Sequence, residues 1–233
     1  MKLLLLSNST IKGETYLAWP REYILNFLTG VKKIAFVPFA GVTFSYTEYT
    51  LSVQNALGAK FEVEGIHSTD NKLDLLRTAD CIIVGGGNTF QLLKKMQEFD
   101  LLKVIEERVR SGIPYIGWSA GANVACPTIM TTNDMPIVQP ASFKALNLIN
   151  FQINAHYTEK LIEGHGGESR GQRLAEFLEL NQQTSVIGLP EGKLLEFAEG
   201  NWYLEGRDSE PTKLFRFNQD PVELLPGKLN LLL

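Results

Sequence analysis

A serine flanked by glycines is the clearest candidate for a reactive side chain in this sequence. Gly117–Gly121 has the sequence Gly-Trp-Ser-Ala-Gly, which fits the G-x-S-x-G pattern. In a nucleophile elbow the serine takes a strained conformation on a sharp strand-to-helix turn, so its neighbours must be small. An apolar run precedes this segment and a helix-compatible run follows it. Ser119 is therefore predicted to be the nucleophile of a hydrolase, with the Ala120 amide as one oxyanion donor.

A serine nucleophile needs a base, and the sequence offers three histidines. His67 follows a predicted strand but comes before the serine. His165 lies between glycines in a loop, which gives poor support for an orienting hydrogen bond. His156 ends a strand predicted over Phe151–Ala155, so it should reach the edge at which open α/β sheets bind ligands. On these grounds His156 is the predicted base.

A third group should hold the histidine in the correct tautomer and stabilise its protonated form. Asp134 lies in a polar loop that follows the serine, directly before a methionine and a proline. Glu191 follows another predicted strand, in the segment Leu-Pro-Glu-Gly. The sequence does not rank the two carboxylates by distance, so both remain candidates.

A glycine-rich turn precedes a helix in the middle of the chain. Gly85–Thr89 has the sequence Gly-Gly-Gly-Asn-Thr and follows the predicted strand Cys81–Val84. Consecutive glycines let the backbone approach a ligand, and amides at a helix N-terminus attract negative charge. The segment lacks the G-x-G-x-x-G pattern and the Walker lysine, which disfavours a nucleotide phosphate site. A tight structural turn is the plain alternative; we expect Gly87 to supply the second oxyanion amide.

No metal or other cofactor is expected. Potential ligands occur in His165–Glu168, but the glycines between them prevent a preorganised face, and no other Cys/His cluster exists. Arg170, at the start of a helix predicted roughly over Glu168–Leu180, has a planar guanidinium that fits a substrate carboxylate. A solvated surface arginine is the commoner role of such a residue.

The elements that would position these residues alternate between strands and helices in the first half. One predicted helix is Leu101–Arg110, whose apolar residues line one face. The predicted strands are Leu3–Leu6, Ile34–Phe39, Phe61–Ile66, Cys81–Val84 and Tyr115–Gly117. This alternation implies right-handed crossovers and a three-layer α/β fold, with a mostly parallel sheet and helices on both faces.

Short apolar runs separated by turn residues dominate the C-terminal part. They predict a parallel strand followed by an antiparallel meander at one edge of the sheet. The runs are Ser185–Leu189, Leu194–Phe197, Trp202–Leu204 and Lys213–Phe217. No repeat or long linker interrupts the chain, so residues 1–233 are predicted to form a single domain.

Composition and charge exclude several classes of protein. A net charge of −4 without a basic run argues against a nucleic-acid or membrane-surface partner. The apolar start Met1–Leu6 is too short for a secretion signal or a membrane span, so a cytoplasmic location is expected. Cys81 and Cys126 lie in apolar surroundings, which predicts two buried thiols rather than a disulfide.

The motifs together resemble serine peptidase family S51, and within it the α-aspartyl dipeptidases. The resemblance spans almost the whole chain and is weakest at the C-terminal end. It rests above all on Ile83–Leu93, Tyr115–Asn123, Thr131–Pro140, Gln152–Tyr157 and Val186–Gly192. It implies a class I glutamine amidotransferase-like fold and metal-free hydrolysis of dipeptides with an N-terminal aspartate, Asp-Xaa.

The resemblance also implies roles for the candidate residues. Ser119 would attack the aspartyl carbonyl to form an acyl-enzyme, with His156 as its base and either Asp134 or Glu191 as the third member. The remaining assignments are to binding: Gly87 and Ala120 would donate to the oxyanion, and Asn88 and Arg170 would line the pocket for the aspartate side chain.

Four other classes were weighed against this one. Lipases and esterases share the elbow but carry their histidine near the C-terminus, whereas 68 residues follow His165 here. Glutamine amidotransferases have a similar architecture but use a cysteine nucleophile. Cyanophycinase, another aspartyl-specific S51 enzyme, acts on a polymer. A non-catalytic binding module would retain a strained elbow without using it. A small peptide is thus the expected partner, and the oligomeric state is left open.

Overall fold

The larger of two β-sheets supplies the frame of the molecule. The computed structural model describes residues 1–160 and 166–229, and within them this sheet has the strand order β12-β9-β8-β1-β5-β4-β2-β3. Its parallel strands are β1 (Leu3–Leu6), β2 (Lys33–Val37), β3 (Glu62–Gly65), β4 (Cys81–Val84) and β5 (Tyr115–Trp118). β1 pairs in parallel with β5 and antiparallel with β8, so it separates the two halves of the sheet.

The antiparallel C-terminal edge predicted from the sequence is present. It consists of β8 (Lys193–Ala198), β9 (Asn201–Gly206) and β12 (Gly227–Leu229), with β8 and β9 forming a hairpin against β1. The expected α/β class with a mostly parallel sheet is therefore confirmed.

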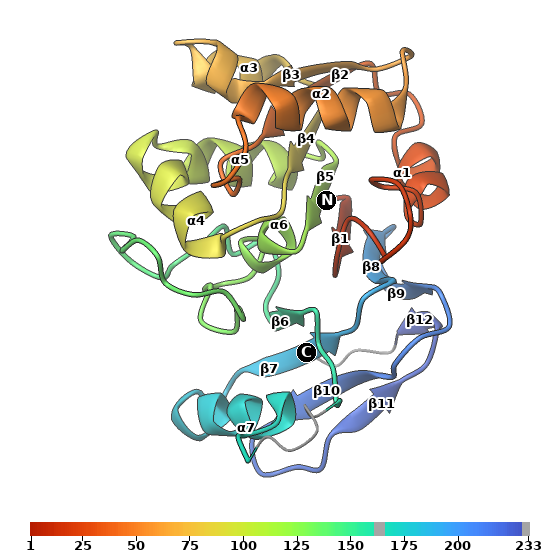
Figure 1. Cartoon of the computed structure of the whole chain (residues 1–233), viewed down its shortest axis with the longest axis vertical. Helices are drawn as coiled ribbons and strands as arrows, with labels where there is room; N and C mark the ends of the chain where they lie inside the picture. The colour runs from red at the N-terminus through yellow and green to blue at the C-terminus, as the bar shows by residue number, and fades with distance from the viewer. Residues whose placement is uncertain (161–165, 230–233) are drawn as a thin grey trace.

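A second sheet, not anticipated from the sequence, carries the rest of the C-terminal strands (Figure 1). Its order is β11-β10-β7-β6, with β6 (Gln152–Ala155) parallel to β7 (Ser185–Leu189). β10 (Thr212–Arg216) and β11 (Val222–Leu224) complete it in antiparallel fashion. The predicted single meander was wrong in this respect, because the turn Pro190–Gly192 takes the chain from β7 in one sheet to β8 in the other.

Helices cover both faces of the larger sheet, as the strand pattern predicts. Alternate leucines of β1 belong to different hydrophobic clusters because successive side chains of a strand point to opposite faces. One cluster includes α3 (Lys72–Thr78), α4 (Thr89–Glu98) and α5 (Leu101–Arg110). The other includes α1 (Arg21–Phe27) and α2 (Tyr46–Leu57). The short elements η1 (Ile66–Ser68) and α6 (Ala120–Asn123) follow β3 and β5.

The second sheet shares its core with the first. Helix α7 (Arg170–Leu180) packs Leu174 and Leu178 on its outer side. On the inner side, Ile153 of β6 and Leu189 of β7 belong to the same buried cluster as two leucines of β1, Leu3 and Leu5. This continuous apolar core supports the prediction of a single domain. Within the described ranges, no helix combines the length and apolar character that a bilayer span requires.

Candidate active site

The predicted nucleophile lies on a strained turn between β5 and α6. Ser119 has φ 53° and ψ −112°, a conformation that costs an L-residue on the order of 1–3 kcal/mol. Its amide donates to the carbonyl of Leu6 at 3.0 Å, and its own carbonyl accepts from Ala122 and Asn123 at 2.9 Å each. Hydrogen bonds on both sides of the residue therefore offset the strain.

The two glycines of the motif are required by close backbone approaches. A Cβ on Gly117 would clash with the carbonyl oxygen of Gly121. A Cβ on Gly121 would clash with the carbonyl oxygen of Val84 on the neighbouring strand. Glycine at both positions of the G-x-S-x-G pattern thus allows the turn to close on itself and to pack against β4.

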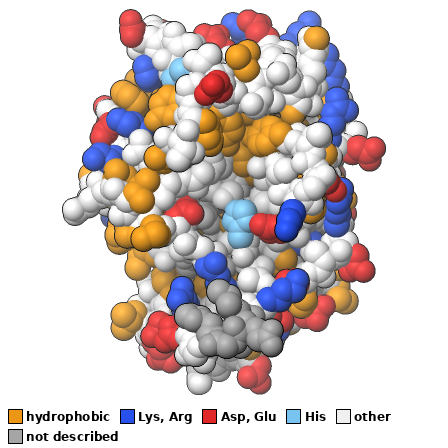
Figure 2. Space-filling model, viewed as in Figure 1, with side chains coloured by type: hydrophobic (Ala, Val, Ile, Leu, Met, Phe, Trp, Pro, Cys, Tyr) orange, Lys and Arg blue, Asp and Glu red, His pale blue; other side chains and the backbone are white. Residues whose placement is uncertain are grey.

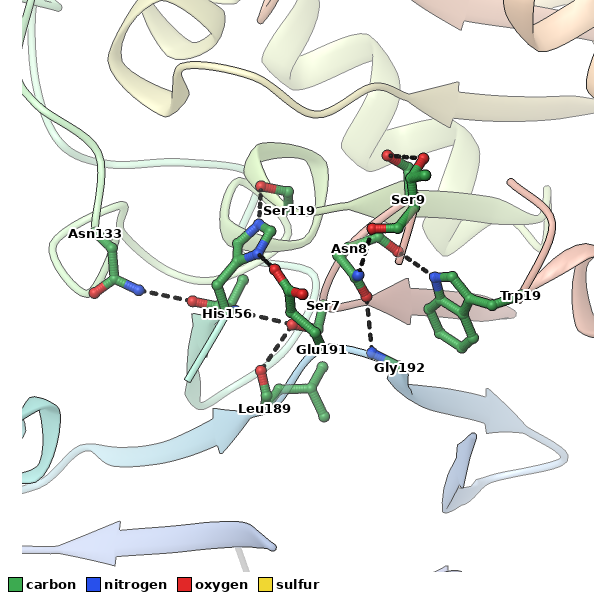
Figure 3. A network of polar contacts seen from close by, with 12 residues as sticks. Ser7, Asn8, Ser9, Trp19, Ser119, Asn133, His156, Leu189, Glu191 and Gly192 are labelled. Atoms are coloured by element: carbon green, nitrogen blue, oxygen red, sulfur yellow. Dashed lines mark hydrogen bonds and ion pairs between the residues drawn. The ribbon is translucent and has the colours of Figure 1, made fainter. Parts of the chain in front are cut away.

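The structure brings three of the predicted residues into one hydrogen-bonded line (Figure 3). His156 Nε2 lies 2.8 Å from Ser119 Oγ, and His156 Nδ1 lies 2.8 Å from Glu191 Oε1. An ionised carboxylate only accepts hydrogen bonds, so Nδ1 must carry the hydrogen and donate it in the bond to Glu191. Nε2 is then left to accept the hydroxyl proton of Ser119, which is the arrangement that a general base needs.

The histidine and the glutamate are open to solvent. Their side chains are 40% and 55% exposed, and acidic, basic and histidine side chains gather near the centre of the face in Figure 2. Solvent screens the attraction between exposed charges. Hydrogen-bond geometry, more than charge, therefore holds the imidazole of His156.

The other candidate carboxylate lies elsewhere. Asp134 accepts from the Thr89 amide at 2.7 Å and from the Thr89 hydroxyl at 2.5 Å, and Thr132 Oγ1 lies 3.2 Å away. It caps the N-terminus of α4, where a negative charge is favourable. The expectation that Asp134 is an alternative third member is not supported by this position, because its carboxylate is committed to α4.

The glycine-rich turn presents a free amide beside the elbow. Gly86 packs against Ser119, and its carbonyl accepts from the Tyr49 hydroxyl at 2.9 Å. Because a trans peptide is planar, the next amide, that of Gly87, points away from Tyr49. Gly87 is exposed and has φ 135°, and a Cβ there would clash with the Ala40 carbonyl. In the described part of the chain, the amides of Gly87 and Ala120 donate to no acceptor.

Asn88 has a structural role in addition to its predicted binding role. Its Oδ1 accepts from the Gln91 amide at 3.0 Å as the N-cap of α4, and its Nδ2 donates to the Met135 carbonyl at 2.8 Å. One Nδ2 hydrogen remains for a ligand. Asn88 therefore fixes the loop that carries Asp134 as well as the start of the helix.

Arg170 is half-buried at the first residue of α7, and no ion pair to it is formed within residues 1–160 and 166–229. Burial, with a smaller contribution from Arg173, lowers the pKa of its guanidinium. The neighbouring Gly171 lies close to Tyr157, which follows His156 in the chain. A half-buried cation of this kind is suited to binding an anion.

His67 does not join this site. His67 lies on η1, 3.2 Å from Thr47 Oγ1 and edge-to-face with Tyr46. His165, discounted as the base, and part of the segment discounted as a metal site lie outside the described residues. Across the described ranges, no group of three His, Cys, Asp or Glu side chains is placed to hold a metal ion.

Both cysteines are free and buried, as predicted. Burial raises the pKa of both thiols, and that of Cys126 reaches about 12. Because the thiolate is the reactive form, neither cysteine is a nucleophile near neutral pH. The cysteine-based alternative is therefore disfavoured by the environment as well as by the position of these residues.

A cavity of about 650 Å³ opens beside the histidine and the glutamate. It is lined by His156, Tyr157, Thr158, Lys160, Pro190, Glu191, Ser209 and Glu210. Sequence reasoning missed a set of polar residues around this site: Ser7, Asn8, Tyr49 and Asn133. Ser7 and Asn8 follow a buried strand at its carboxyl end, the same signal that singled out His156, and could have been found by it.

The fold and the site define a serine hydrolase of the class I glutamine amidotransferase-like architecture. Within that class, the chain belongs to peptidase family S51, whose model matches residues 3–204. It is similar to Peptidase E of Nostoc sp., with 48% identity over 97% of this chain and 93% of that protein. The match to Peptidase E of Salmonella typhimurium is also 48% identical, over 97% of this chain and 99% of that protein. The protein is accordingly a serine peptidase.

Two solved structures have the same fold. A putative Peptidase E from Listeria monocytogenes superposes with a TM-score of 0.64 at 22% identity, covering 89% of this chain and 98% of that chain. A peptidase from an acI-B1 Actinobacterium superposes with a TM-score of 0.66 at 19% identity, covering 96% of each chain. At such identities the likeness concerns the fold alone.

Proposed function

We propose that this protein hydrolyses dipeptides with an N-terminal aspartate through an acyl-enzyme on Ser119. The observation that carries the proposal is the line of 2.8 Å contacts from Ser119 through His156 to Glu191. The 48% identical relatives named Peptidase E support the substrate class. A small peptide is the proposed partner. Two free thiols fit the cytoplasm as the proposed location.

In the proposed mechanism, His156 takes up one proton and gives it back in each half of the reaction. His156 Nε2 takes the Ser119 proton as Oγ attacks the aspartyl carbonyl carbon. The amides of Gly87 and Ala120 stabilise the oxyanion that forms. The protonated His156, held by Glu191, then gives its proton to the departing amine, which leaves an ester on Ser119. The same nitrogen then takes a proton from the water that attacks the ester, and it returns that proton to Ser119 Oγ as the ester bond breaks and aspartate is released.

Selectivity for aspartate is assigned to Arg170 and Asn88. Arg170 is half-buried, and burial lowers the pKa of its guanidinium, so a carboxylate that pairs with it relieves a cost already present. Asn88 Nδ2 contributes a neutral donor near the oxyanion amide of Gly87. Together the two residues recognise the charge of the aspartate side chain and its position relative to the scissile bond.

Removal of the nucleophile tests the reaction. Ser119→Ala should lower kcat for Asp-Leu by at least about 10⁴-fold, because the enzyme can no longer form the ester. The circular dichroism spectrum and the unfolding transition should be retained. Mass spectrometry of the wild-type protein after treatment with a fluorophosphonate should show one adduct, on Ser119, and the Ser119→Ala variant should show none. Turnover of Asp-Leu by the variant close to that of the wild type would rule out the nucleophile.

Replacement of the arginine tests the substrate class. Arg170→Met should raise KM for Asp-Leu on the order of 100-fold, the cost of one charge-assisted carboxylate contact. Hydrolysis of Asn-Leu should change little. The matched control is Arg173→Met, since Arg173 is 62% exposed and pairs only loosely with Glu168. Equal losses on Asp-Leu and Asn-Leu would remove Arg170 from the recognition of aspartate.

A further inference from the structure

Three consecutive residues at the carboxyl end of β1 contact the backbone around every member of the triad (Figure 3). The Leu6 carbonyl accepts from the Ser119 amide at 3.0 Å. Ser7 Oγ accepts from the His156 amide at 2.8 Å. Asn8 Oδ1 accepts from the amide of Gly192, the residue after the glutamate, at 2.9 Å. Ser7 is fully buried and Asn8 is 2% exposed, so these contacts are shielded from water.

The peptide that precedes the histidine side chain is held from both sides. His156 has φ 55°, which turns its amide out of the ladder between β6 and β7. Ser7 Oγ accepts that amide and donates its own proton to the Leu189 carbonyl at 2.8 Å. On the opposite side, Asn133 Nδ2 donates to the Ala155 carbonyl at 2.7 Å. Both polar groups of this planar unit are thus fixed by side chains, and the direction of the imidazole follows from it.

The turn that carries the glutamate is held by Asn8, which follows Ser7 after the end of β1. Gly192 has φ 80° and donates to Asn8 Oδ1 directly after Glu191. Asn8 is itself fixed: its Nδ2 donates to the Thr10 carbonyl at 2.9 Å, and its carbonyl accepts from Trp19 Nε1 at 3.2 Å. A rigid acceptor therefore sets the position of the Glu191 backbone, although the Glu191 side chain is more than half exposed.

We propose that Ser7 and Asn8 are positioning residues for the triad, Ser7 acting through His156 and Asn8 through Glu191. The inference rests on the proposed serine hydrolase chemistry. β6 and the turn Pro190–Gly192 meet the nucleophile across the junction of two sheets, so local structure does not set the distance between them. A displacement of about 1 Å costs on the order of 100-fold in rate. The buried side chains of Ser7 and Asn8, directly after β1, keep that distance.

The test for Ser7 is a double-mutant cycle read out by the chemistry of the nucleophile. The rate constant for labelling of Ser119 by a fluorophosphonate requires proton removal but no aspartyl group. Ser7→Ala should lower this rate roughly 10- to 100-fold and lower kcat for Asp-Leu similarly, with KM unchanged. In the His156→Ala background, Ser7→Ala should have no further effect, because its action passes through the histidine. Equal losses in both backgrounds would overturn the proposal.

The test for Asn8 has the same form. Asn8→Ala should lower the labelling rate roughly 10-fold and should lose this effect in the Glu191→Gln background. Asn8→Asp keeps the acceptor for Gly192, so it should restore the labelling rate even though the donor to Thr10 is lost. An Asn8→Asp variant as slow as Asn8→Ala, or additive losses with Glu191→Gln, would show that Asn8 does not act through the glutamate.

Two serine variants separate positioning from general destabilisation. Ser9→Ala is the neighbouring control, since Ser9 Oγ contacts only Thr10 Oγ1 at 3.4 Å. Ser68→Ala removes a hydroxyl-to-carbonyl bond of 2.8 Å at the far edge of the sheet, comparable to that of Ser7 with Leu189. Both should label at the wild-type rate. If Ser7→Ala does not fold, Ser7→Cys, which retains a weak donor and acceptor, carries the same cycle.

The outcome distinguishes this inference from the proposed function. Absence of any adduct on Ser119 in the wild-type protein would contradict the serine hydrolase chemistry itself. Normal labelling of the wild type together with normal labelling of Ser7→Ala and Asn8→Ala would leave that chemistry intact and overturn the positioning role.

Discussion

The proposed nucleophile and its two proposed partners are held in different ways. Ser119 lies within the parallel sheet, where β4 and β5 leave room only for glycines on either side of it. His156 and Glu191 lie at the end of the second sheet, and their side chains are partly exposed. Their positions depend on Ser7, Asn8 and Asn133, which are distant in the sequence. One region is set by steric fit and the other by a few long-range hydrogen bonds.

This difference indicates how each region should respond to substitution. Where tight packing fixes the backbone, even one added Cβ has a large effect, because it clashes with backbone atoms that cannot move aside. A site held by hydrogen bonds loses one contact at a time, and each contact contributes on the order of 1 kcal/mol. Substitutions in the elbow should therefore affect folding and activity together, whereas those around the histidine should affect activity first.

The largest effect is expected in the elbow. Gly121→Ala places a Cβ against the carbonyl oxygen of Val84, so the turn must shift away from β4. The free energy of unfolding should fall by on the order of 4 kcal/mol, and labelling of Ser119 should fall below detection. Gly166→Ala is the control, because a Cβ there meets no atom of the described residues within 4 Å. A stable, active Gly121→Ala protein would contradict the steric account.

An intermediate effect is expected at the exposed carboxylate. Glu191→Gln removes the charge opposite His156 Nδ1, and kcat for Asp-Leu should fall on the order of 100- to 1,000-fold with little change in stability. Asp134→Asn should do the reverse: the free energy of unfolding should fall by about 1–3 kcal/mol, while kcat changes less than tenfold. Chemical denaturation and steady-state kinetics on the two variants decide between the carboxylates.

The smallest effect concerns the segment after the histidine. Glu210 accepts from Thr158 Oγ1 and the Glu159 amide and pairs with Lys160 at 3.0 Å. Burial alone would raise the pKa of Glu210, but the contacts from Thr158, Lys160 and Glu159 outweigh it and lower that pKa.

A lowered pKa in the folded state makes the contribution of Glu210 fully present above the ordinary glutamate pKa and lost as pH falls through the folded value. Glu210→Gln should therefore destabilise the protein by less than about 1 kcal/mol near neutral pH. The difference from the wild type should vanish at pH values below the lowered pKa of Glu210. Urea denaturation across this range measures it, and a difference that grows in acid would contradict the assignment.

Local patterns in the sequence predicted the parts of the fold that local forces determine. The bounds of β1, β4 and α5 match the apolar runs because both faces of those strands and one face of that helix are buried. The Ser119 elbow was predictable for the same reason, since its glycines are required by adjacent residues and by the strand next to it. Elimination among three histidines led to His156, which the structure places 2.8 Å from Ser119.

Tertiary choices were beyond the reach of these patterns. Asp134 lies in a polar loop and Glu191 follows a predicted strand, and only the path of β6 and β7 through a second sheet decides which one faces the histidine. The assignment of β10 to that sheet depends on pairing with β7 rather than on its own residues. Ser7 and Asn8 look like ordinary turn residues, because their partners lie 149 and 184 positions further along the chain.

The contacts of β1 also determine when the catalytic centre can exist during synthesis. β1 leaves the ribosome before the partners of Ser7 and Asn8, which lie 149 and 184 positions further along the chain. Closing such long loops is slow and comes late in folding. A nascent chain that ends between Ser119 and Gly192 contains the nucleophile but lacks the Gly192 contact with Asn8 that positions Glu191. The contacts that position the histidine and the glutamate therefore form only after the chain has been synthesised past Gly192.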